Sequence, residues 1–407
     1  MAKRPFRFLH AADFHLEAVP QGIAEVPDHL RESLLEAAYR SAARVFDAAL
    51  AEEADFLILA GDLLHVEQAG PRGSLFLMEQ FQRLAERGMA VYWAGGPSDP
   101  PETWSAALAL PENVHVFPQN RVTEYVHQQE GVPVVRIAGI SRDRQRPLRV
   151  QDFDPDPAGL FTIAVVHAAD EMPAAEPRAV HYWALGGRHD RTTLAGAPSV
   201  MHYPGSPQAR RPEESGAHGC TLVEVDEHGQ VRTSPLPTDV LRFQQERVAI
   251  DESASRNDLE ALLAARLRAL ADAAPLVDLL VWWTLSVPGS LATQLRRGGV
   301  AKELLDGLRR DFGHGSPAAW SVAIDVQPPA SLPKPWYEQE TIRADFLRAI
   351  RHLQMNPAEP LGLEPYLAES HQAGSLGCLA APASDEARQR VLQEAAMLGV
   401  DLLSGEE

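Results

Sequence analysis

Short apolar runs alternate with amphipathic stretches along the first part of the chain. The runs are strand-like, and the stretches between them carry apolar side chains at helical spacing. In chain order these segments are residues 6–12, 28–54, 55–60, 73–87 and 90–94. Asp28 stands where it can cap the first helix. Strands that alternate with helices predict a parallel sheet with right-handed crossovers.

The pattern changes twice further along. More short runs predict strands at 114–117, 121–127, 132–139, 161–166, 182–185, 200–203 and 221–226. From about residue 247, strands and helices alternate again, at 247–250, 258–272, 277–287, 301–312 and 320–326. A proline-rich linker at 327–335 leads to helices near 338–354 and 385–398. We therefore predict an α/β domain over 1–245, a small α+β domain over 246–330 and a helical arm over 331–407.

Composition limits the class of protein. The 407 residues, 45% hydrophobic and 23% charged, are typical of a soluble globular protein with two or three domains. A net charge of -19 argues against a protein that covers its whole surface with nucleic acid, although a local basic groove is compatible with it. Cys220 and Cys378 form no metal-binding spacing. Without a membrane-length apolar run or a signal peptide, we expect a cytoplasmic protein with no membrane segment.

Aspartate and histidine side chains follow the ends of the predicted strands. Asp13 and His15 come directly after the first run, and residues two apart on an extended backbone lie on the same side. Carboxylate and imidazole groups are common ligands of zinc, manganese and iron. Later strand ends supply Asp62, His167 and His189. Because α/β sheets bind ligands at the carboxyl ends of their strands, these residues predict a shared metal site.

The motifs around these residues resemble those of the calcineurin-like metallophosphoesterases. Residues 10–16 match an H-x-x-D-x-H-L motif, and residues 61–63 match G-D-L. Residues 182–189 resemble Y-x-A-L-G-H-x-H, and residues 203–208 read Y-P-G-S-P-Q, with Glu214 shortly after. The last segment resembles more narrowly the nuclease subunit of SbcC–SbcD type DNA repair complexes, in its YhaO-like bacterial branch. The likeness covers about residues 6–245.

The resemblance implies a fold and a metal centre. The fold is a metallophosphoesterase β-sandwich flanked by helices, followed by a small α+β capping domain and a C-terminal helical arm that binds a partner. Two Mn²⁺ ions share a bridging Asp and hydrolyse phosphodiesters. Carried over to this chain, one ion is held by Asp13, His15, Asp62 and His189, and the second keeps Asp62 and His167.

Three positions depart from the family pattern. Gly96-Pro97-Ser98-Asp99 stands in place of G-N-H-D, so Pro97 replaces an Asn ligand and Ser98 replaces the catalytic His. Gly187 replaces the first His of G-H-x-H. The ligand set of the first ion is therefore complete, whereas the second has lost two ligands and no catalytic imidazole is intact. A serine hydroxyl cannot act as an imidazole acid at neutral pH.

Three interpretations of the function remain open. The first is a Mn²⁺-dependent DNA exonuclease subunit that acts on DNA ends, forms a homodimer and works with an SbcC-like coiled-coil ABC ATPase. The second is a weak or inactive member that serves as a DNA-end or ATPase-binding scaffold, and the third is a one-metal phosphoesterase for a small substrate. Five arginines are candidates for phosphate contacts, and for each the alternative is a position in a solvated loop. They are Arg142, Arg144, Arg146, Arg210 and Arg211.

Overall fold

The computed structural model describes residues 4–23, 25–104, 109–142, 150–168, 180–251, 254–287, 289–327, 332, 334–362 and 384–403. The chain divides into two compact units. The first comprises residues up to 245 with 273–280 and 314–319, and the second comprises the remainder. Residues on both sides of the linker thus belong to the second unit, and the three-domain division stays a prediction. None of the described helices has the length and apolar character needed to cross a membrane.

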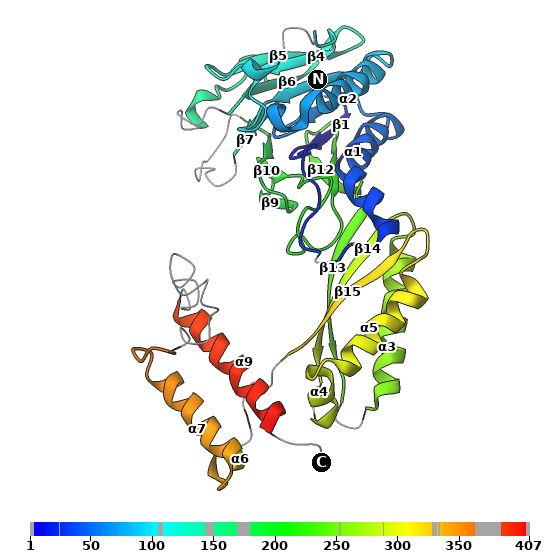
Figure 1. Ribbon diagram of the computed structural model, residues 1–407. Helices are drawn as coiled ribbons and strands as arrows, with labels where there is room; N and C mark the ends of the chain where they lie inside the picture. Colours follow the sequence, from blue (N-terminus) through cyan, green and yellow to red (C-terminus); the bar gives the residue numbers. More distant parts are fainter. Residues whose placement is uncertain are drawn as a thin grey trace. The chain divides into compact units, whose positions relative to one another are not determined.

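The first unit is built on two six-stranded sheets (Figure 1). The first sheet has the order β12-β11-β1-β2-β3-β4. Strands β1 to β4 are parallel, while β11 and β12 are added antiparallel. The strands are β1 (Phe6–Ala11), β2 (Phe56–Leu59), β3 (Ala90–Ala94), β4 (Val114–Phe117), β11 (Gly219–Val225) and β12 (Val231–Pro237). This confirms the parallel sheet predicted from the alternation of strands and helices.

The second sheet has the order β5-β6-β7-β8-β10-β9. Its inner strands β6, β7, β8 and β10 are parallel, and β5 and β9 close the edges in the antiparallel direction. The strands are β5 (Thr123–Gln129), β6 (Val132–Ile140), β7 (Phe161–His167), β8 (Tyr182–Gly186), β9 (Thr192–Ala195) and β10 (Val200–Tyr203). Short 3₁₀ turns lie at Pro101–Thr103 and Val150–Asp152.

Buried aromatic and aliphatic side chains join the two sheets into a sandwich. Phe8 stacks on Phe56 with ring centroids 5.0 Å apart and meets Tyr182 of the other sheet edge-on at 5.4 Å. Ile58 and Ile163 extend the same core. Because the sandwich core comes from alternate residues of β1, β2, β7 and β8, it fixes the relative position of the loops that follow these strands.

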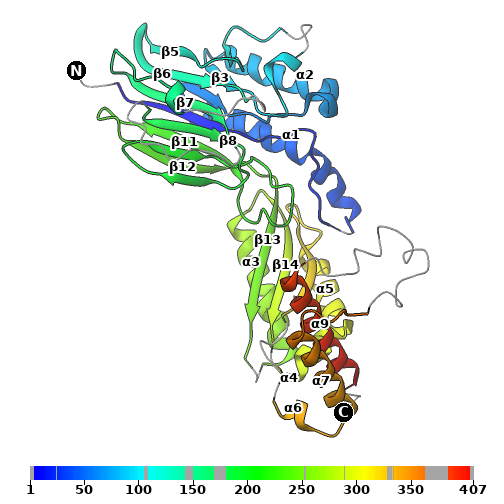
Figure 2. The ribbon, with the colours of Figure 1, turned by 90° about the vertical axis from the view of Figure 1, so that its left-hand side faces the viewer.

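Two helices cover the outer face of the first sheet (Figures 1 and 2). They are α1 (Asp28–Ala51) and α2 (Val66–Ala85). Phe46 of α1 and Phe81 of α2 pack with Leu57 and Trp93 of the sheet, all fully buried. Two sheets with flanking helices form the helix-flanked β-sandwich that the sequence predicted.

The helix starts differ from those predicted. Pro27 occupies the N-cap position of α1 without a side-chain cap, so the predicted capping role of Asp28 is wrong; Asp28 lies in the first turn and pairs with exposed Arg31. Helix α2 spans Val66–Ala85 but is kinked at Gly70, whose backbone is non-helical with φ 59° and ψ -162°. The helix predicted over 73–87 corresponds to the part of α2 that follows the kink.

A third sheet has the order β13-β14-β15, formed by β13 (Leu241–Ala249), β14 (Asp278–Ser286) and β15 (Ala319–Val326). Helices α3 (Arg256–Ala273) and α5 (Gly299–Phe312) lie along one face of it, with α4 (Gly289–Arg296) before α5 (Figure 2). Leu259, Leu263 and Leu267 line the buried stripe of α3. The sequence predicted each of these strands and helices except α4, although for β13 it predicted only residues 247–250.

The last helices are α6 (Pro335–Glu338), α7 (Ile342–Met355) and α9 (Asp385–Leu403). Thr341 caps α7 by accepting the N–H of Ala344. Helices α7 and α9 pack through Leu347, Ala396 and Val400. Several apolar side chains of this pair stay exposed, namely Ile342, Met355, Val391, Leu398, Leu402 and Leu403.

A pair of buried histidines makes the sandwich sensitive to acid. His202 on β10 hydrogen-bonds Thr193 and Thr221, and burial lowers its pKa to about 4. Burial, and then the neighbouring His202, also lower the pKa of His10 on β1. As the pH falls below about 6.5, these histidines bind protons in the unfolded chain but remain neutral in the folded chain. The folded state therefore loses stability between about pH 6.5 and about pH 4.

Lowering the pH from about 7.5 to about 5 is expected to reduce the free energy of unfolding. The lowered pKa of His202 by itself accounts for about 2 kcal/mol of this reduction. Urea unfolding at the two pH values measures this. His202→Gln keeps polar contacts for Thr193 and Thr221 but cannot titrate, so its stability is expected to fall less. An equal pH dependence in the variant would show that His202 is not the group responsible.

Candidate metal centre

Three of the predicted ligands lie on loops that turn sharply after the strands, while His167 is the last residue of β7. Asp13 and His15 follow β1 with φ of 57° and 45°, in the left-handed region, and Asp62 follows β2 with φ of 54°. The predicted extended backbone at Asp13 and His15 is therefore wrong, and their side chains converge because the loop turns at each of them. Such residues cost on the order of 1–3 kcal/mol each and occur where function requires them.

Backbone hydrogen bonds hold the loops after β1 and β2 together. The Asp13 N–H donates to the Gly61 carbonyl over 2.9 Å, and the His15 N–H donates to the Asp62 carbonyl over 3.1 Å. The pairing of β1 with β2 thus continues past the ends of both strands. It brings the side chains of Asp13 and Asp62 to the same place.

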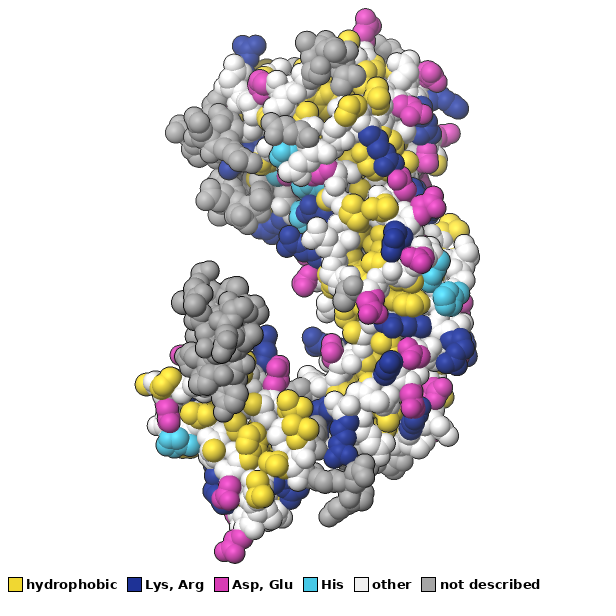
Figure 3. Space-filling model, in the orientation of Figure 1, with side chains coloured by type: hydrophobic (Ala, Val, Ile, Leu, Met, Phe, Trp, Pro, Cys, Tyr) yellow, Lys and Arg dark blue, Asp and Glu magenta, His cyan; other side chains and the backbone are white. Residues whose placement is uncertain are grey.

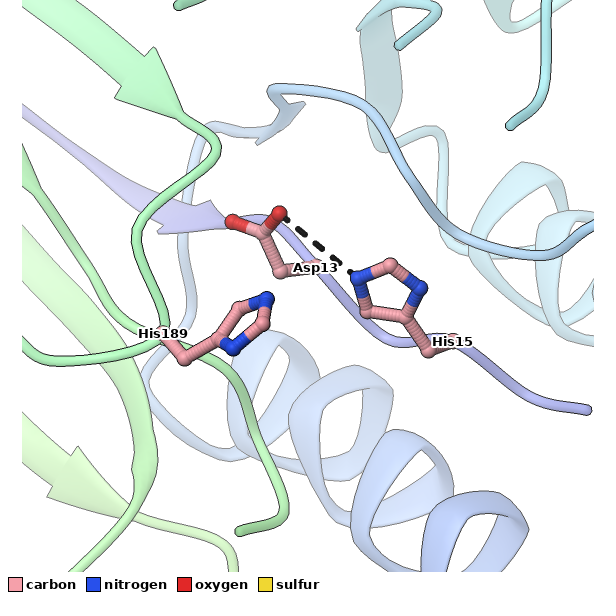
Figure 4. Close-up of side chains that lie close together, drawn as sticks. All are labelled: Asp13, His15 and His189. Atoms are coloured by element: carbon pink, nitrogen blue, oxygen red, sulfur yellow. Dashed lines mark ion pairs between the residues drawn. The ribbon is translucent and has the colours of Figure 1, made fainter. Parts of the chain in front are cut away.

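The first group of candidate ligands combines Asp13 and His15 with His189. Their ligand atoms all lie within 4.8 Å of one another. Figure 4 shows both imidazole rings turned toward Asp13, His15 from the loop after β1 and His189 from the segment after β8. His15 Nε2 is 3.9 Å from Asp13 Oδ1. An Asp with two His is a common ligand set for Zn²⁺, Mn²⁺ or Fe²⁺.

The second group consists of Asp13, Asp62 and His167, all buried, with ligand atoms within the same 4.8 Å. His167 Nε2 lies 3.3 Å from Asp13 Oδ1 and 3.5 Å from Asp62 Oδ2. Asp62 also approaches His15 Nε2, at 4.0 Å. The residue common to both groups is therefore Asp13, whereas the sequence had given that bridging place to Asp62.

The residues present fit a divalent cation. His15 Nε2 is buried and has no hydrogen-bond partner among the described residues. A buried imidazole nitrogen without a partner is costly unless something binds it. Two carboxylates in one buried place repel each other, and a cation between them removes that repulsion. That these residues bind a divalent metal is our proposal.

The acidic surroundings act on His167. Burial lowers its pKa, but the hydrogen bond to Asp13 and the charges of Asp13, Asp62 and Asp99 outweigh burial and leave the pKa raised. A histidine ligand must be unprotonated at the nitrogen that binds the metal. Metal affinity at this group is therefore expected to weaken as pH falls.

Sequence comparison identifies relatives of the chain. It is 30% identical over 267 residues to the uncharacterized metallophosphoesterase YhaO of Bacillus subtilis, an alignment that covers 61% of this chain and 64% of that protein. It is 26% identical over 271 residues to the DNA double-strand break repair protein Mre11 of Aeropyrum pernix, covering 60% and 63%. The chain is therefore similar to metallophosphoesterases. It aligns with slightly less than two thirds of each relative's length.

No family model matches the chain. A dimetal phosphatase from Danio rerio is a solved structure that matches it with a TM-score of 0.33 and 12% identity, over 56% of this chain and 98% of that one.

The Gly96–Asp99 turn has a structural role beside the candidate ligands. Asp99 is fully buried and accepts the N–H groups of Asp62, Leu63 and Gly96 at 2.6–3.0 Å. Burial and the charge of Asp62 raise the pKa of Asp99 to about 7, although the three N–H donors act to lower it. The N–H of Ser98 donates to Asp62 Oδ1 over 2.9 Å. The turn therefore positions Asp62 through its backbone.

Gly187 also contributes its backbone and no side chain. Its N–H donates to Asp13 Oδ2 over 2.8 Å, and its φ is 105°. A histidine at this position would have to adopt a conformation that L-residues rarely adopt. At position 187, where the motif has a histidine, the backbone therefore has a positive φ that glycine adopts easily.

Sequence reasoning missed two carboxylates that contact the histidines of the first group. Glu214 Oε1 lies 2.9 Å from His189 Nδ1, and Glu17 Oε1 lies 3.6 Å from His15 Nδ1. Burial raises the pKa of Glu214, but the hydrogen bonds with His189 and with the Arg210 N–H outweigh burial and lower that pKa to about 2. No spacing in the sequence indicates that Glu214 reaches His189.

The arginines predicted to contact phosphates lie in different places. A nitrogen of Arg210 is 2.6 Å from His189 Nε2 and 2.9 Å from Nδ1, which places it beside the ring and along neither lone pair. Arg211 is exposed, Arg142 is half-buried, and Arg144 and Arg146 lie outside the described residues. Figure 3 shows Lys and Arg side chains beside histidines on one face of the first unit. Arg210 is thus the predicted arginine that adjoins the candidate ligands.

Proposed function

We propose that this protein is a metal-dependent phosphodiesterase that acts on DNA ends, as the nuclease subunit of an SbcC–SbcD type repair complex in the cytoplasm. The observation that carries the proposal is the convergence of two ligand groups on Asp13. Similarity to a protein named for DNA double-strand break repair supports DNA as the substrate. The Y-P-G-S-P-Q segment at 203–208 supports the same branch of the family.

The proposed metal is Mn²⁺, held by Asp13, His15 and His189, with Asp62 and His167 available for a second ion. A divalent cation polarises a phosphoryl oxygen and lowers the pKa of a bound water. The chain itself supplies the charge and geometry. Gly187 and the Gly96–Asp99 turn orient Asp13 and Asp62, and Arg210 places a positive charge beside His189, where it can meet a phosphate.

A second candidate function is a scaffold that binds DNA ends or the ATPase without cutting. The observation in its favour is the Gly96–Asp99 turn, in which a serine hydroxyl stands where the family has an imidazole. Loss of a positioned acid or base typically costs 10²–10⁴-fold in rate, roughly. The partners proposed for either function are DNA ends, an SbcC-like coiled-coil ABC ATPase and a second copy of the chain. Exposed apolar side chains on α7 and α9, such as Leu398 and Leu402, support a docking role for the arm.

Metal content and DNA cleavage, measured together, separate the two functions. We expect protein stripped with chelator and dialysed against Mn²⁺ to retain at least one ion per chain, and to shorten linear duplex DNA only when the ion is present. Retention of Mn²⁺ with end-binding but no cleavage would establish the scaffold instead. A protein that retains no Mn²⁺ would contradict the proposed metal centre. Two tightly retained ions would show that the second group is functional despite Pro97 and Gly187.

A further inference from the structure

Two glutamates outside the candidate ligand groups face the histidines of the first group. Glu214 Oε1 contacts His189 Nδ1 at 2.9 Å, which is a hydrogen bond. Glu17 Oε1 lies 3.6 Å from His15 Nδ1, at ion-pair distance but beyond a hydrogen bond. In both cases the nitrogen concerned is Nδ1. His15 Nε2 has no hydrogen-bond partner among the described residues, whereas a nitrogen of Arg210 lies 2.6 Å from His189 Nε2.

Each glutamate is anchored independently of its histidine. The second oxygen of Glu214 accepts the Arg210 N–H over 2.6 Å, and that of Glu17 accepts the His65 N–H over 2.8 Å. The side chain of Glu214 is mostly buried, with 12% of its surface exposed, and that of Glu17 has 11%. Because a backbone N–H binds one oxygen of each carboxylate, the other oxygen has a fixed position. The imidazole ring must therefore orient its Nδ1 toward that oxygen.

We propose that Glu214, and more weakly Glu17, are positioning residues that select the metal-binding tautomer of His189 and His15. An ionised carboxylate can only accept, so the nitrogen facing it must carry the proton. Nε2 is then unprotonated and presents its lone pair to a cation. The unpartnered buried Nε2 of His15 agrees with this arrangement. The inference rests on the proposed metal centre and adds residues that the family motifs do not contain as ligands.

The geometry also ranks the two residues. Glu214 is within hydrogen-bond distance of its histidine and Glu17 is not, so Glu214 should matter more. Partners of this kind typically change metal affinity by about 10–100-fold. We therefore expect Glu214→Ala to weaken Mn²⁺ binding by about that factor. Glu214→Gln retains an oxygen that can accept from Nδ1 and should recover part of the affinity, while Glu17→Gln should lose only a few-fold.

The test is a competition titration of Mn²⁺ against a fluorescent chelator, on the full chain. Glu213→Gln is the matched control, because Glu213 is the exposed neighbour of Glu214 in the same loop. Nitrogen NMR of histidine-labelled, metal-free protein reports the tautomer directly. We expect His189 to be protonated at Nδ1 in the wild type and to lose this preference in Glu214→Ala. Glu214→Gln provides the same readouts if Glu214→Ala does not fold.

The outcomes separate this inference from the proposed function. Equal Mn²⁺ affinity and an unchanged His189 tautomer in the folded Glu214 variants would overturn the positioning role, even if the protein cuts DNA. A wild type that binds no Mn²⁺ would overturn the proposed metal centre. The tautomer measurement uses metal-free protein, so it still decides whether Glu214 selects the tautomer in that case.

Discussion

Replacing Asp13 by asparagine is expected to remove metal binding from both candidate groups at once. Asp13 is the residue that the two groups share, and it lies between His15, His189 and His167. The variant keeps the size of the side chain and loses the charge. Since a metal contributes several kcal/mol to transition-state stabilisation, we expect phosphodiesterase activity to fall by at least about 100-fold. Bound Mn²⁺ per chain and the rate of DNA cleavage measure the two effects.

Asp190→Asn is the matched control for this experiment. Asp190 is exposed, adjoins His189 in sequence and belongs to neither candidate group. Asp190→Asn removes one negative charge from the segment that carries His189, so Mn²⁺ content and cleavage should stay near the wild-type values. If Asp13→Asn retained its metal and the control lost it, the assignment of the centre to Asp13 would be wrong.

Replacing Asp99 by alanine is expected to destabilise the first unit strongly. The buried carboxylate accepts the N–H groups of Asp62, Leu63 and Gly96, and alanine leaves all three without an acceptor. Each unsatisfied buried group costs about 1–3 kcal/mol, so we expect the free energy of unfolding to fall by roughly 3–5 kcal/mol. The same change frees the loop that holds Asp62. The urea midpoint and Mn²⁺ affinity should both drop.

Ser98→Ala serves as the comparison for Asp99→Ala. It changes the neighbouring side chain and leaves the Ser98 N–H, which contacts Asp62, in place. Its urea midpoint should lie close to that of the wild type. A midpoint for Asp99→Ala that also matched the wild type would mean that water replaces the carboxylate, and that Asp99 does not hold the turn.

Periodicity was sufficient to predict the buried elements of the fold. Strands β2, β3 and β7 are almost entirely buried and mostly apolar, and α1 and α2 have an apolar face, so their pattern follows from burial. Among the described elements that the sequence did not predict are β9, β12, α4 and the short helix α6. Strand β12 carries two prolines and no buried residue, and it pairs with β11 through its backbone. Backbone pairing leaves no hydrophobic signature in a sequence.

The site was predicted as a set of residues, but its grouping was not. Motif resemblance selected Asp13, His15, Asp62, His167 and His189, and the structure brings their ligand atoms together in two groups. The positive φ at Asp13 and His15 depends on backbone bonds to the neighbouring loop, which no local pattern reveals. Glu214 was missed as a partner of His189 for the same reason, because its contact requires two loops to meet.

The division of the candidate ligands between the two sheets has a consequence for biosynthesis. Asp13, His15 and Asp62 follow strands of one sheet, whereas His167 and His189 follow strands of the other. A chain emerging from the ribosome therefore carries half a centre until the second sheet has been made and has docked. Loading with metal must be a late event in maturation, and a loaded ion would clamp the two halves of the sandwich against separation.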